Sequence, residues 1–210
     1  DIIEAAPRLL PALSKNVSKK VESRLRELGV NIFLNRMVVK EEVEEVFLKD
    51  MELKTKTVIW TAGTKTHHLY ARIKGLVFDE RGRIVVDDFL RAKEFNDIFI
   101  IGDAAATTYS GMAQTAIHNG RYVAEIISRK IRSQSFFPYR DKKPSYAIPI
   151  GPNWAAVLIG PLRFYGRFGW LLRRLADLRY FLSILPFKKA LLAFQSGKTL
   201  CESCPICSED

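Results

Sequence analysis

A glycine–aspartate pair in the middle of the chain is the first candidate for chemistry. It follows four apolar residues, Ile98–Ile101, which predict a strand buried on both faces. Gly102 and Asp103 would then lie at the carboxyl end of that strand, where open α/β sheets bind their ligands. Glycine lets a ligand approach the backbone closely, and a carboxylate accepts hydrogen bonds from the hydroxyls of a ribitol or ribose chain. The pair therefore indicates a binding site for a ligand that carries such hydroxyls.

The residues after this pair predict a helix that would complete the site. The run AQTAIHNGRYVAEIISRKI has helical character and is expected to form a helix at about 112–131. The first N–H groups of a helix have no partner within it and attract negative charge or a carbonyl oxygen. A ligand beside Asp103 would therefore meet a helix N-terminus as well as a carboxylate.

Other elements must hold these residues in place. Apolar residues at spacings of four, four and three predict an amphipathic helix that ends at Gly29: Val17, Val21, Leu25 and Leu28. A strand is expected at 30–34, short strands of a β-meander within 36–57, and a second buried strand at 57–63. Residues 133–153 are rich in Pro, Ser, aromatic and basic residues, which favours a loop or linker.

The C-terminal part of the chain carries most of its positive charge. From Arg129 onward there are 14 Lys and Arg against 5 Asp and Glu, and the whole chain has a formal net charge of +10. Such asymmetry favours an anionic partner, either lipid or nucleic acid. No apolar run reaches the roughly 18 residues that a membrane span needs.

Residues 161–198 combine this charge with aromatic side chains and a leucine stripe at helical spacing: Leu171, Leu175, Leu178, Leu182 and Leu185. Pro186 ends that run, a second short helix is expected at 187–194, and Gly197 would cap it. The pattern favours an interfacial membrane anchor whose arginine side chains reach the lipid phosphates. The alternative is a helix packed on the protein's own core or on a second copy of the chain. Nucleic acid is the less favoured partner, because a stripe of five leucines is poorly suited to bind phosphates.

Two further groups of residues have the types of metal ligands. His67 and His68 are adjacent in a polar loop, point in different directions, and are interpreted as solvated. Cys201, Cys204 and Cys207 have the spacing of part of an iron–sulfur or zinc motif, but no fourth ligand follows, so an oxidisable tail is the preferred interpretation. No metal site is therefore predicted. Cysteines gathered at one end do not make a disulfide framework, which favours a reducing compartment.

Several segments together resemble the type II NADH:quinone oxidoreductases, which belong to the FAD-dependent pyridine nucleotide-disulfide oxidoreductase superfamily. The similarity lies in the strings VIWTAGTKTHHL, GLVFDERGRIVVDDFLRA, IFIIGDAAA, AQTAIHNGRYVAEII and the basic Trp- and Leu-containing tail. The resemblance implies an α/β fold, namely the C-terminal part of a Rossmann-like flavoprotein with two dinucleotide-binding domains plus a helical membrane-associated module. The implied divisions are 1–63 (NADH-binding domain), 64–132 (returning FAD-binding domain), 133–200 (membrane-associated module) and 201–210 (cysteine tail). Neither glycine-rich phosphate loop of the family is present in the chain, so the sequence is expected to be truncated at its N-terminus.

The same resemblance implies roles for individual residues. Glu4 would accept hydrogen bonds from the adenosine ribose of NADH. Ala62 and Gly63 would lie on a strand that passes close to the cofactors, while Gly102 and Asp103 would bind the ribityl–phosphate part of FAD.

The start of the predicted helix at 112–131 is implied to face the flavin. Gln114, Thr115 and Ala116 would meet the isoalloxazine ring and the quinone pocket. His118 stands where the family commonly has a second glutamine, and it could donate a hydrogen bond or a proton to a quinone. Gln114 and His118 are accordingly the candidate catalytic residues.

The activity implied by the resemblance is electron transfer from NADH through FAD to a membrane quinone, at the cytoplasmic face of a membrane and with peripheral attachment. The fragment is expected to be inactive alone, and a homodimer is an open alternative. Two other functions compete with this one. The first is a non-catalytic membrane-binding or interaction module. The second is a sulfide:quinone oxidoreductase-like enzyme, ranked lower because the cysteines lie beyond the membrane segment.

Overall fold

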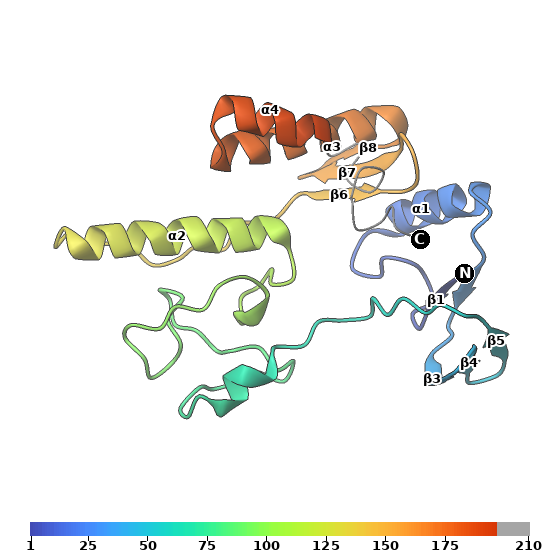
Figure 1. The fold of residues 1–210 in the computed structure, drawn as a ribbon, viewed down its shortest axis with the longest axis horizontal. Coiled ribbons are helices and arrows are strands. Elements are labelled where there is room, and N and C mark those ends of the chain that lie inside the picture. Colours follow the sequence, from blue (N-terminus) through green and yellow to red (C-terminus); the bar gives the residue numbers. More distant parts are fainter. Residues whose placement is uncertain (197–210) are drawn as a thin grey trace, which may run out of the picture. The chain divides into compact units, whose positions relative to one another are not determined.

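The computed structural model describes residues 1–196, and these form two compact units. The first unit contains Asp1–Val58 together with the described residues from Tyr146 onward, and the second contains Ile59–Ser145. Figure 1 shows the helices and strands along the chain. The divisions at residues 63, 132 and 200 expected from the sequence remain predictions.

The first unit begins with a β–α–β motif. Strand β1 (Ile2–Glu4) pairs in parallel with β2 (Ile32–Leu34), and helix α1 (Lys15–Glu27) connects them. The helix predicted to end at Gly29 and the strand predicted at 30–34 are both confirmed. Val17 and Val21, four residues apart, are buried on one face of α1, and Gly29 follows the helix with a φ of +80°.

A β-meander follows, as the sequence predicts. Strands β3 (Val38–Glu42), β4 (Glu45–Leu48) and β5 (Glu52–Lys54) form an antiparallel sheet in that order. In β4 the residues Val46 and Leu48 are buried while their neighbours are less so, which is the alternation expected of a strand with one covered face.

The C-terminal part of this unit contains a sheet that the sequence did not predict. Strands β6 (Tyr146–Pro149), β7 (Ala155–Ile159) and β8 (Leu162–Phe164) are antiparallel. The interpretation of 133–153 as a loop or linker is therefore wrong for β6. Pro149 stands at the end of β6, where a missing N–H is tolerated, so the proline-rich composition was misleading.

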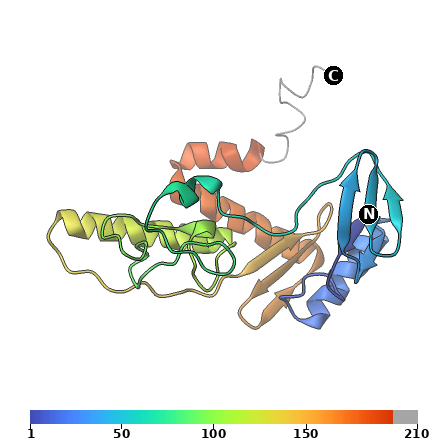
Figure 2. The same ribbon diagram turned by 90° about the horizontal axis from the view of Figure 1, so that it is seen from below.

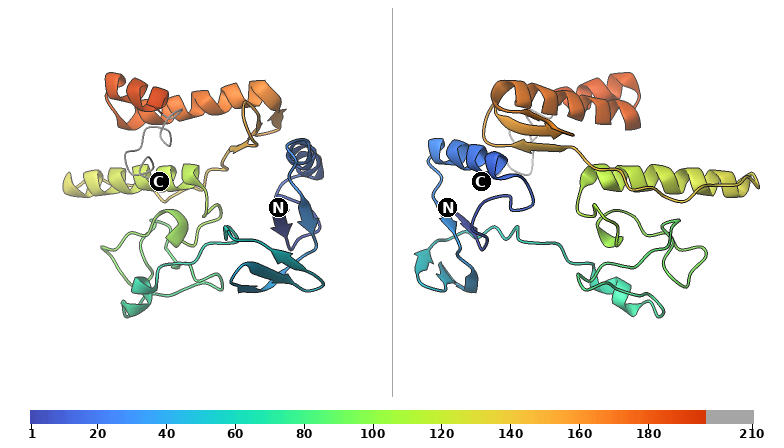
Figure 3. Two further views of the ribbon diagram at one scale, coloured as in Figure 1. Left: turned by 45° about the vertical axis from the view of Figure 1, so that its right-hand side comes forward. Right: turned by 180° about the vertical axis from the view of Figure 1, so that it is seen from behind.

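Helices α3 (Gly166–Ile184) and α4 (Phe187–Ser196) complete the unit and lie side by side in both views of Figure 3. Their break at Pro186 is confirmed, whereas Gly197 and the three cysteines lie outside the described residues. Gly169 lets α3 approach β7 closely, because a Cβ at that position would lie 2.2 Å from the Ala155 carbonyl oxygen. No helix within residues 1–196 is both long enough and apolar enough to cross a bilayer.

One core joins the first and last segments of this unit. Val17 and Val21 of α1 pack in a cluster with Ile150, Ala156 and Leu158. A second core, in the other unit, contains Ile84, Ala92, Ile100 and Ala105.

The second unit has little regular structure apart from helix α2 (Ala113–Ile131), which is confirmed at the predicted place. Figure 2 shows α2 running along the extended segments of this unit. Short 3₁₀ turns cover His68–Arg72 and Gly102–Ala104.

Two predicted strands are wrong. Residues 57–63 form no strand, and Ile59 and Trp60 are 81% and 62% exposed. Ile98–Ile101 is extended and bonds to Leu90–Ala92 on one side only, so that Ile100 is buried but Ile101 is exposed. A strand buried on both faces requires neighbours along its whole length, and the described residues do not supply them.

Candidate functional site

The Gly102–Ala104 turn presents Asp103 to a cavity. Gly102 has a φ of +65°, a conformation that glycine adopts without steric cost, and its carbonyl accepts the N–H of Ala105 at 3.2 Å. The chain thus turns sharply directly after the buried Ile100. The predicted turn at the end of the apolar run is confirmed, although that run is not a regular strand.

The cavity beside this turn has a volume of about 200 Å³ and is lined by seven residues: Thr64, Lys65, Thr66, His67, Arg83, Asp103 and Ala104. Asp103 is exposed, and its carboxylate makes no hydrogen bond or ion pair within residues 1–196. Lys65 and Arg83 bring positive charge to the same walls. A free acceptor next to fixed cations suits a ligand that carries both hydroxyl and phosphate groups.

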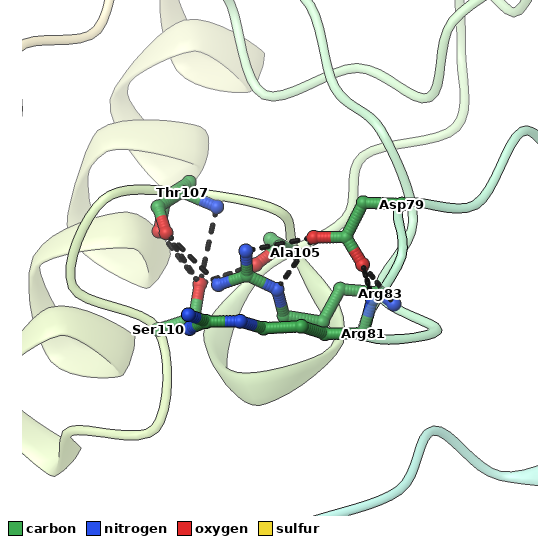
Figure 4. A network of polar contacts seen from close by, with 6 residues as sticks. All are labelled: Asp79, Arg81, Arg83, Ala105, Thr107 and Ser110. Atoms are coloured by element: carbon green, nitrogen blue, oxygen red, sulfur yellow. Dashed lines mark hydrogen bonds and ion pairs between the residues drawn. The ribbon is translucent and has the colours of Figure 1, made fainter.

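The Arg83 wall of the cavity is held by a polar network (Figure 4). The Asp79 carboxylate accepts the Nε–H of Arg83 at 2.8 Å, and Arg83 Nη1 donates to the Thr107 carbonyl at 3.2 Å. Hydrogen bonding by the Arg83 N–H, assisted by the guanidinium, holds the pKa of Asp79 below its ordinary value of 3.8. Asp79 therefore stays ionised at neutral pH and keeps Arg83 in place.

Ser110 holds the loop that follows Asp103. Its hydroxyl donates to the Ala105 carbonyl and accepts the Thr107 N–H at 3.1 Å, as Figure 4 shows. Thr107 is thus held by both Arg83 and Ser110. The loop that carries Asp103 is anchored directly after the site residue.

Helix α2 contacts the glycine turn through its first two turns. The Gly102 N–H donates to Asn119 Oδ1 at 3.1 Å, and a Cβ on Gly102 would lie 3.4 Å from the Cβ of Ala116. Thr115 is 3% exposed, so its side chain is packed inside the unit. The structure therefore brings Gly102, Asp103 and Ala116 together.

Gln114 and His118 face a different segment. Gln114 Oε1 accepts the N–H of Ser145 at 2.9 Å, and His118 Nε2 lies 3.1 Å from the carbonyl oxygen of Arg140. Neither residue lines the cavity beside Asp103. Their side chains tie α2 to the segment 135–145, to which Tyr122 also bonds through the Phe137 carbonyl at 2.8 Å.

A second cavity of about 540 Å³ lies between α2 and that segment. Its lining is largely apolar and aromatic, with charged groups among it: His118, Tyr122, Glu125, Ile126, Arg129, Phe136, Phe137, Pro138 and Arg140. Burial, together with the charge of Asp87, raises the pKa of Tyr122 to about 12. The Tyr122 hydroxyl therefore stays protonated at neutral pH and remains a hydrogen-bond donor.

The other predicted site residues lie in separate places. Gly63 has a φ of +82° and directly precedes Thr64 of the small cavity, and the Ala62 carbonyl accepts the indole N–H of Trp60 at 3.2 Å. Glu4 belongs to the other unit, at the end of β1, where its carboxylate accepts the N–H of Ala6 at 2.8 Å.

Sequence reasoning missed three residues that shape the site, namely Lys65, Arg83 and Asn119. Nothing in their local pattern marks them, because each is one polar residue in an ordinary loop or helix. Their proximity to the Gly102–Ala104 turn comes from folding alone. No cluster of His, Cys, Asp and Glu able to hold a metal is found in the described part of the chain, to which the three cysteines do not belong.

Comparisons with known proteins show which family the chain is similar to. A family model described as Pyridine nucleotide-disulphide oxidoreductase matches residues 1–120. The type II NADH:quinone oxidoreductase of Haemophilus influenzae is 32% identical over 150 residues, which are 67% of this chain and 34% of that protein. The type II NADH:quinone oxidoreductase Ndh of Mycobacterium tuberculosis is 28% identical over 194 residues, 85% of this chain and 41% of that protein.

The fold is similar to that of a solved structure, NDH2 from Plasmodium falciparum in complex with NADH. The TM-score is 0.74 at 16% identity, and the match covers 95% of this chain and 58% of that one. The regions matched in the two bacterial relatives are 34% and 41% of their lengths, so this chain spans less than half of each relative.

Proposed function

The chain belongs to the pyridine nucleotide-disulphide oxidoreductase family, and on this premise we propose that the protein passes electrons from NADH through FAD to a membrane quinone. The observation that carries the proposal is the free Asp103 carboxylate at the mouth of a cation-lined cavity, on a glycine turn that touches α2. The similarity to type II NADH:quinone oxidoreductases supports the choice of donor and acceptor.

The residues present fit FAD. Asp103 would accept hydrogen bonds from the ribityl hydroxyls, and Lys65 and Arg83 would face the phosphates. Gly63 and Gly102 would let the backbone approach the cofactor. When bound, FAD supplies the acceptance of a hydride and the delivery of two electrons.

The first turn of α2 would stabilise negative charge on the flavin ring. We propose that Gln114 and Thr115 act here chiefly through their backbone N–H groups, because the Thr115 side chain is buried and the Gln114 side-chain carbonyl oxygen is already bonded to Ser145. The Ala116 N–H is already bonded to the Met112 carbonyl at 3.0 Å, so Ala116 would contribute through its small side chain beside Gly102. The amide nitrogen of Gln114 has no hydrogen bond within residues 1–196 and is free to donate to a carbonyl.

The quinone pocket is proposed to be the larger cavity. Its aromatic walls, which include Tyr122 and Phe136, suit a flat, apolar ring. His118 would meet the quinone through Nδ1, because Nε2 donates to the Arg140 carbonyl. In the neutral ring Nδ1 accepts a hydrogen bond from a reduced quinone, and it would donate a proton only as the imidazolium.

NADH is proposed to bind in the other unit, at the β–α–β motif. Glu4 lies at the carboxyl end of β1, and one of its oxygens remains available beyond the bond to Ala6. It would accept hydrogen bonds from the adenosine ribose and disfavour a 2′-phosphate.

Helices α3 and α4 are proposed to attach the protein peripherally to the cytoplasmic face of a membrane. Within the described residues they expose apolar side chains by 39–70%: Phe168, Leu171, Leu175, Tyr180, Leu182, Ile184, Phe187, Leu191 and Leu192. Basic residues such as Arg167, Lys188 and Lys189 lie on the same two helices. Each basic residue near an anionic leaflet adds about 1 kcal/mol. A second copy of the chain is the competing occupant of this surface.

Three assays and one substitution in the full-length protein test the proposal. Purified protein should show the absorbance of oxidised flavin, oxidise NADH with a soluble quinone as acceptor, and float with anionic but not zwitterionic vesicles. Asp103→Asn should lower FAD affinity by about tenfold, which corresponds to the loss of one charge-assisted hydrogen bond. Protein that holds no flavin would refute the enzyme and favour a non-catalytic membrane-binding module.

A further inference from the structure

Asn119 is a fully buried polar residue in the middle of α2. Its exposed fraction is 0%, and it lies on the buried face of the helix with Thr115, Val123 and Ile126. A buried amide costs free energy unless it is hydrogen-bonded, and a leucine of similar size would suit this face better. A polar residue here therefore requires a reason outside simple packing.

The side-chain oxygen of Asn119 has a hydrogen-bond partner in the glycine turn. Asn119 Oδ1 accepts the N–H of Gly102 at 3.1 Å, across 17 residues of sequence. The Asn119 amide nitrogen makes no hydrogen bond of good geometry within residues 1–196. Asn119 therefore contacts the glycine turn through its side-chain oxygen.

This hydrogen bond fixes the backbone of Gly102, the residue directly before Asp103. Gly102 has positive φ, and its carbonyl is already used by Ala105 within the 3₁₀ turn. Glycine is the residue with the most backbone freedom, so an unheld Gly102 would let the turn vary. Asn119 accepts the Gly102 N–H, and the carbonyl side of Gly102 continues directly into Asp103.

We propose that Asn119 is a positioning residue for the flavin, which acts by holding the Gly102 amide so that the Asp103 carboxylate meets the ribityl hydroxyls. The inference rests on the proposed binding of FAD and assigns a role to a residue that does not itself touch the cofactor. Catalytic and binding groups need positioning to well under 1 Å, and a second layer of hydrogen bonds commonly supplies it.

Two substitutions of similar volume in the full-length protein test this role. Asn119→Leu removes the acceptor, and we expect the Kd for FAD to rise about tenfold, the effect of losing one well-placed hydrogen bond. Asn119→Asp keeps an oxygen at the same place, and burial favours its neutral form. Measured at a pH low enough for this carboxyl to be neutral, it should stay within about threefold of the wild type. If Asn119→Leu does not fold, Asn119→Ser carries the comparison, since its hydroxyl is too short to reach Gly102.

The midpoint potential of the bound flavin gives a reading that a purely structural role would not move. A looser turn lets the flavin ring move away from the N-terminus of α2, so the potential should become more negative in Asn119→Leu. The potential should be restored in Asn119→Asp at the lower pH where that carboxyl is neutral and adds no charge of its own. Val123→Ala is the control, because Val123 is 8% exposed on the same helix face and does not touch Gly102. It should lower the melting temperature without changing the Kd for FAD or the potential.

A double-mutant cycle with Asp103→Asn decides whether the two residues act together. If Asn119 works through Asp103, Asn119→Leu should cost little further FAD affinity once Asp103 is replaced. Fully additive effects, or equal Kd values for Asn119→Leu and Val123→Ala, would overturn the inference while FAD binding by the wild type stands. A wild type that holds no FAD would instead overturn the proposed function and this inference together.

Discussion

Two five-residue turns in the second unit have the same hydrogen-bond design but different surroundings. In each, an aspartate accepts the N–H groups of the second and fourth residues after it, and its other oxygen accepts the Nε–H of an arginine at the fourth position. The first turn is Asp79–Arg83, with these bonds at 3.0, 2.8 and 2.8 Å. The second is Asp87–Arg91, with bonds at 2.9, 2.9 and 2.8 Å.

The turns differ at the position before the arginine, where both have positive φ. That residue is Gly82 in the first turn, with open space around it, and Leu90 in the second, with a φ of +59° and 1% exposure. A left-handed conformation costs a non-glycine residue about 1–2 kcal/mol, whereas burying a leucine contributes about 2–3 kcal/mol. Burial therefore outweighs the backbone cost at Leu90.

The arginines also have different uses. Arg83 reaches the Thr107 carbonyl and lines the cavity beside Asp103, whereas Arg91 lies over the ring of Phe89 at 5.0 Å. The same local motif thus lines a cavity in one copy and supports the core in the other. Four measurements test this difference.

The largest expected effect is at Leu90. Leu90→Ala should destabilise the protein by about 3 kcal/mol, because it leaves a cavity in the core and keeps the strained backbone. Leu90→Gly removes one more carbon but relieves the strain, so it should be no worse than Leu90→Ala. Chemical denaturation of both variants checks this. A Leu90→Gly variant clearly less stable than Leu90→Ala would show that backbone strain is not significant here.

Removal of the aspartate charge from the second turn should destabilise the protein less than Leu90→Ala does. Asp87→Asn is expected to destabilise by about 1.5 kcal/mol, near the lower end for charged hydrogen bonds because the side chain is about one-third exposed. The matching Asp79→Asn should instead weaken FAD binding severalfold, since it frees Arg83 at the cavity wall. Denaturation and flavin titration of both variants are the measurements. Equal losses of FAD affinity would mean that the two turns do not differ in function.

Gly82→Ala should destabilise by about 1 kcal/mol, because alanine must adopt positive φ while no neighbour clashes with its Cβ. Thermal unfolding measures this change. None of the hydrogen bonds to the Asp79 carboxylate involves Gly82, so FAD affinity should change little. Arg83→Lys serves as the comparison that should lose affinity without strain. A neutral Gly82→Ala would contradict the assignment of strain at this position.

The smallest effect concerns acid. Hydrogen bonds lower the pKa of Asp79, and at Asp87 the bonds from Arg91 outweigh the rise caused by burial, so both folded pKa values lie below 3.8. A depressed carboxylate stabilises the fold above the unfolded pKa, and this contribution is lost as the pH falls through the folded value. Stability should therefore fall below about pH 4, and the double variant Asp79→Asn/Asp87→Asn should show a shallower fall in pH-dependent denaturation. An unchanged slope would show that neither carboxylate contributes.

Several features could be predicted from the sequence because they depend on near neighbours. The spacing of Val17 and Val21 predicted α1, and the turn at Gly102 was expected from an apolar run that ends in glycine. The strand expected at 57–63 was wrong because apolar content does not show whether a neighbouring strand exists. The sheet at β6 to β8 was missed because its burial depends in part on α1, which lies more than 100 residues earlier in the sequence.

The positions of helices α1, α2, α3 and α4, and the glycine turn before Asp103, follow from the order of the residues alone. Those features rest on periodicity and on the conformational freedom of single residues, which act over a few positions. Other contacts arise only when the unit folds. Arg83 and Lys65 then share a cavity with Asp103, Asn119 bonds to Gly102, and Gln114 and His118 bond to residues 140–145. Such contacts join residues 17 to 38 positions apart, and packing of the whole unit selects them because no local preference can.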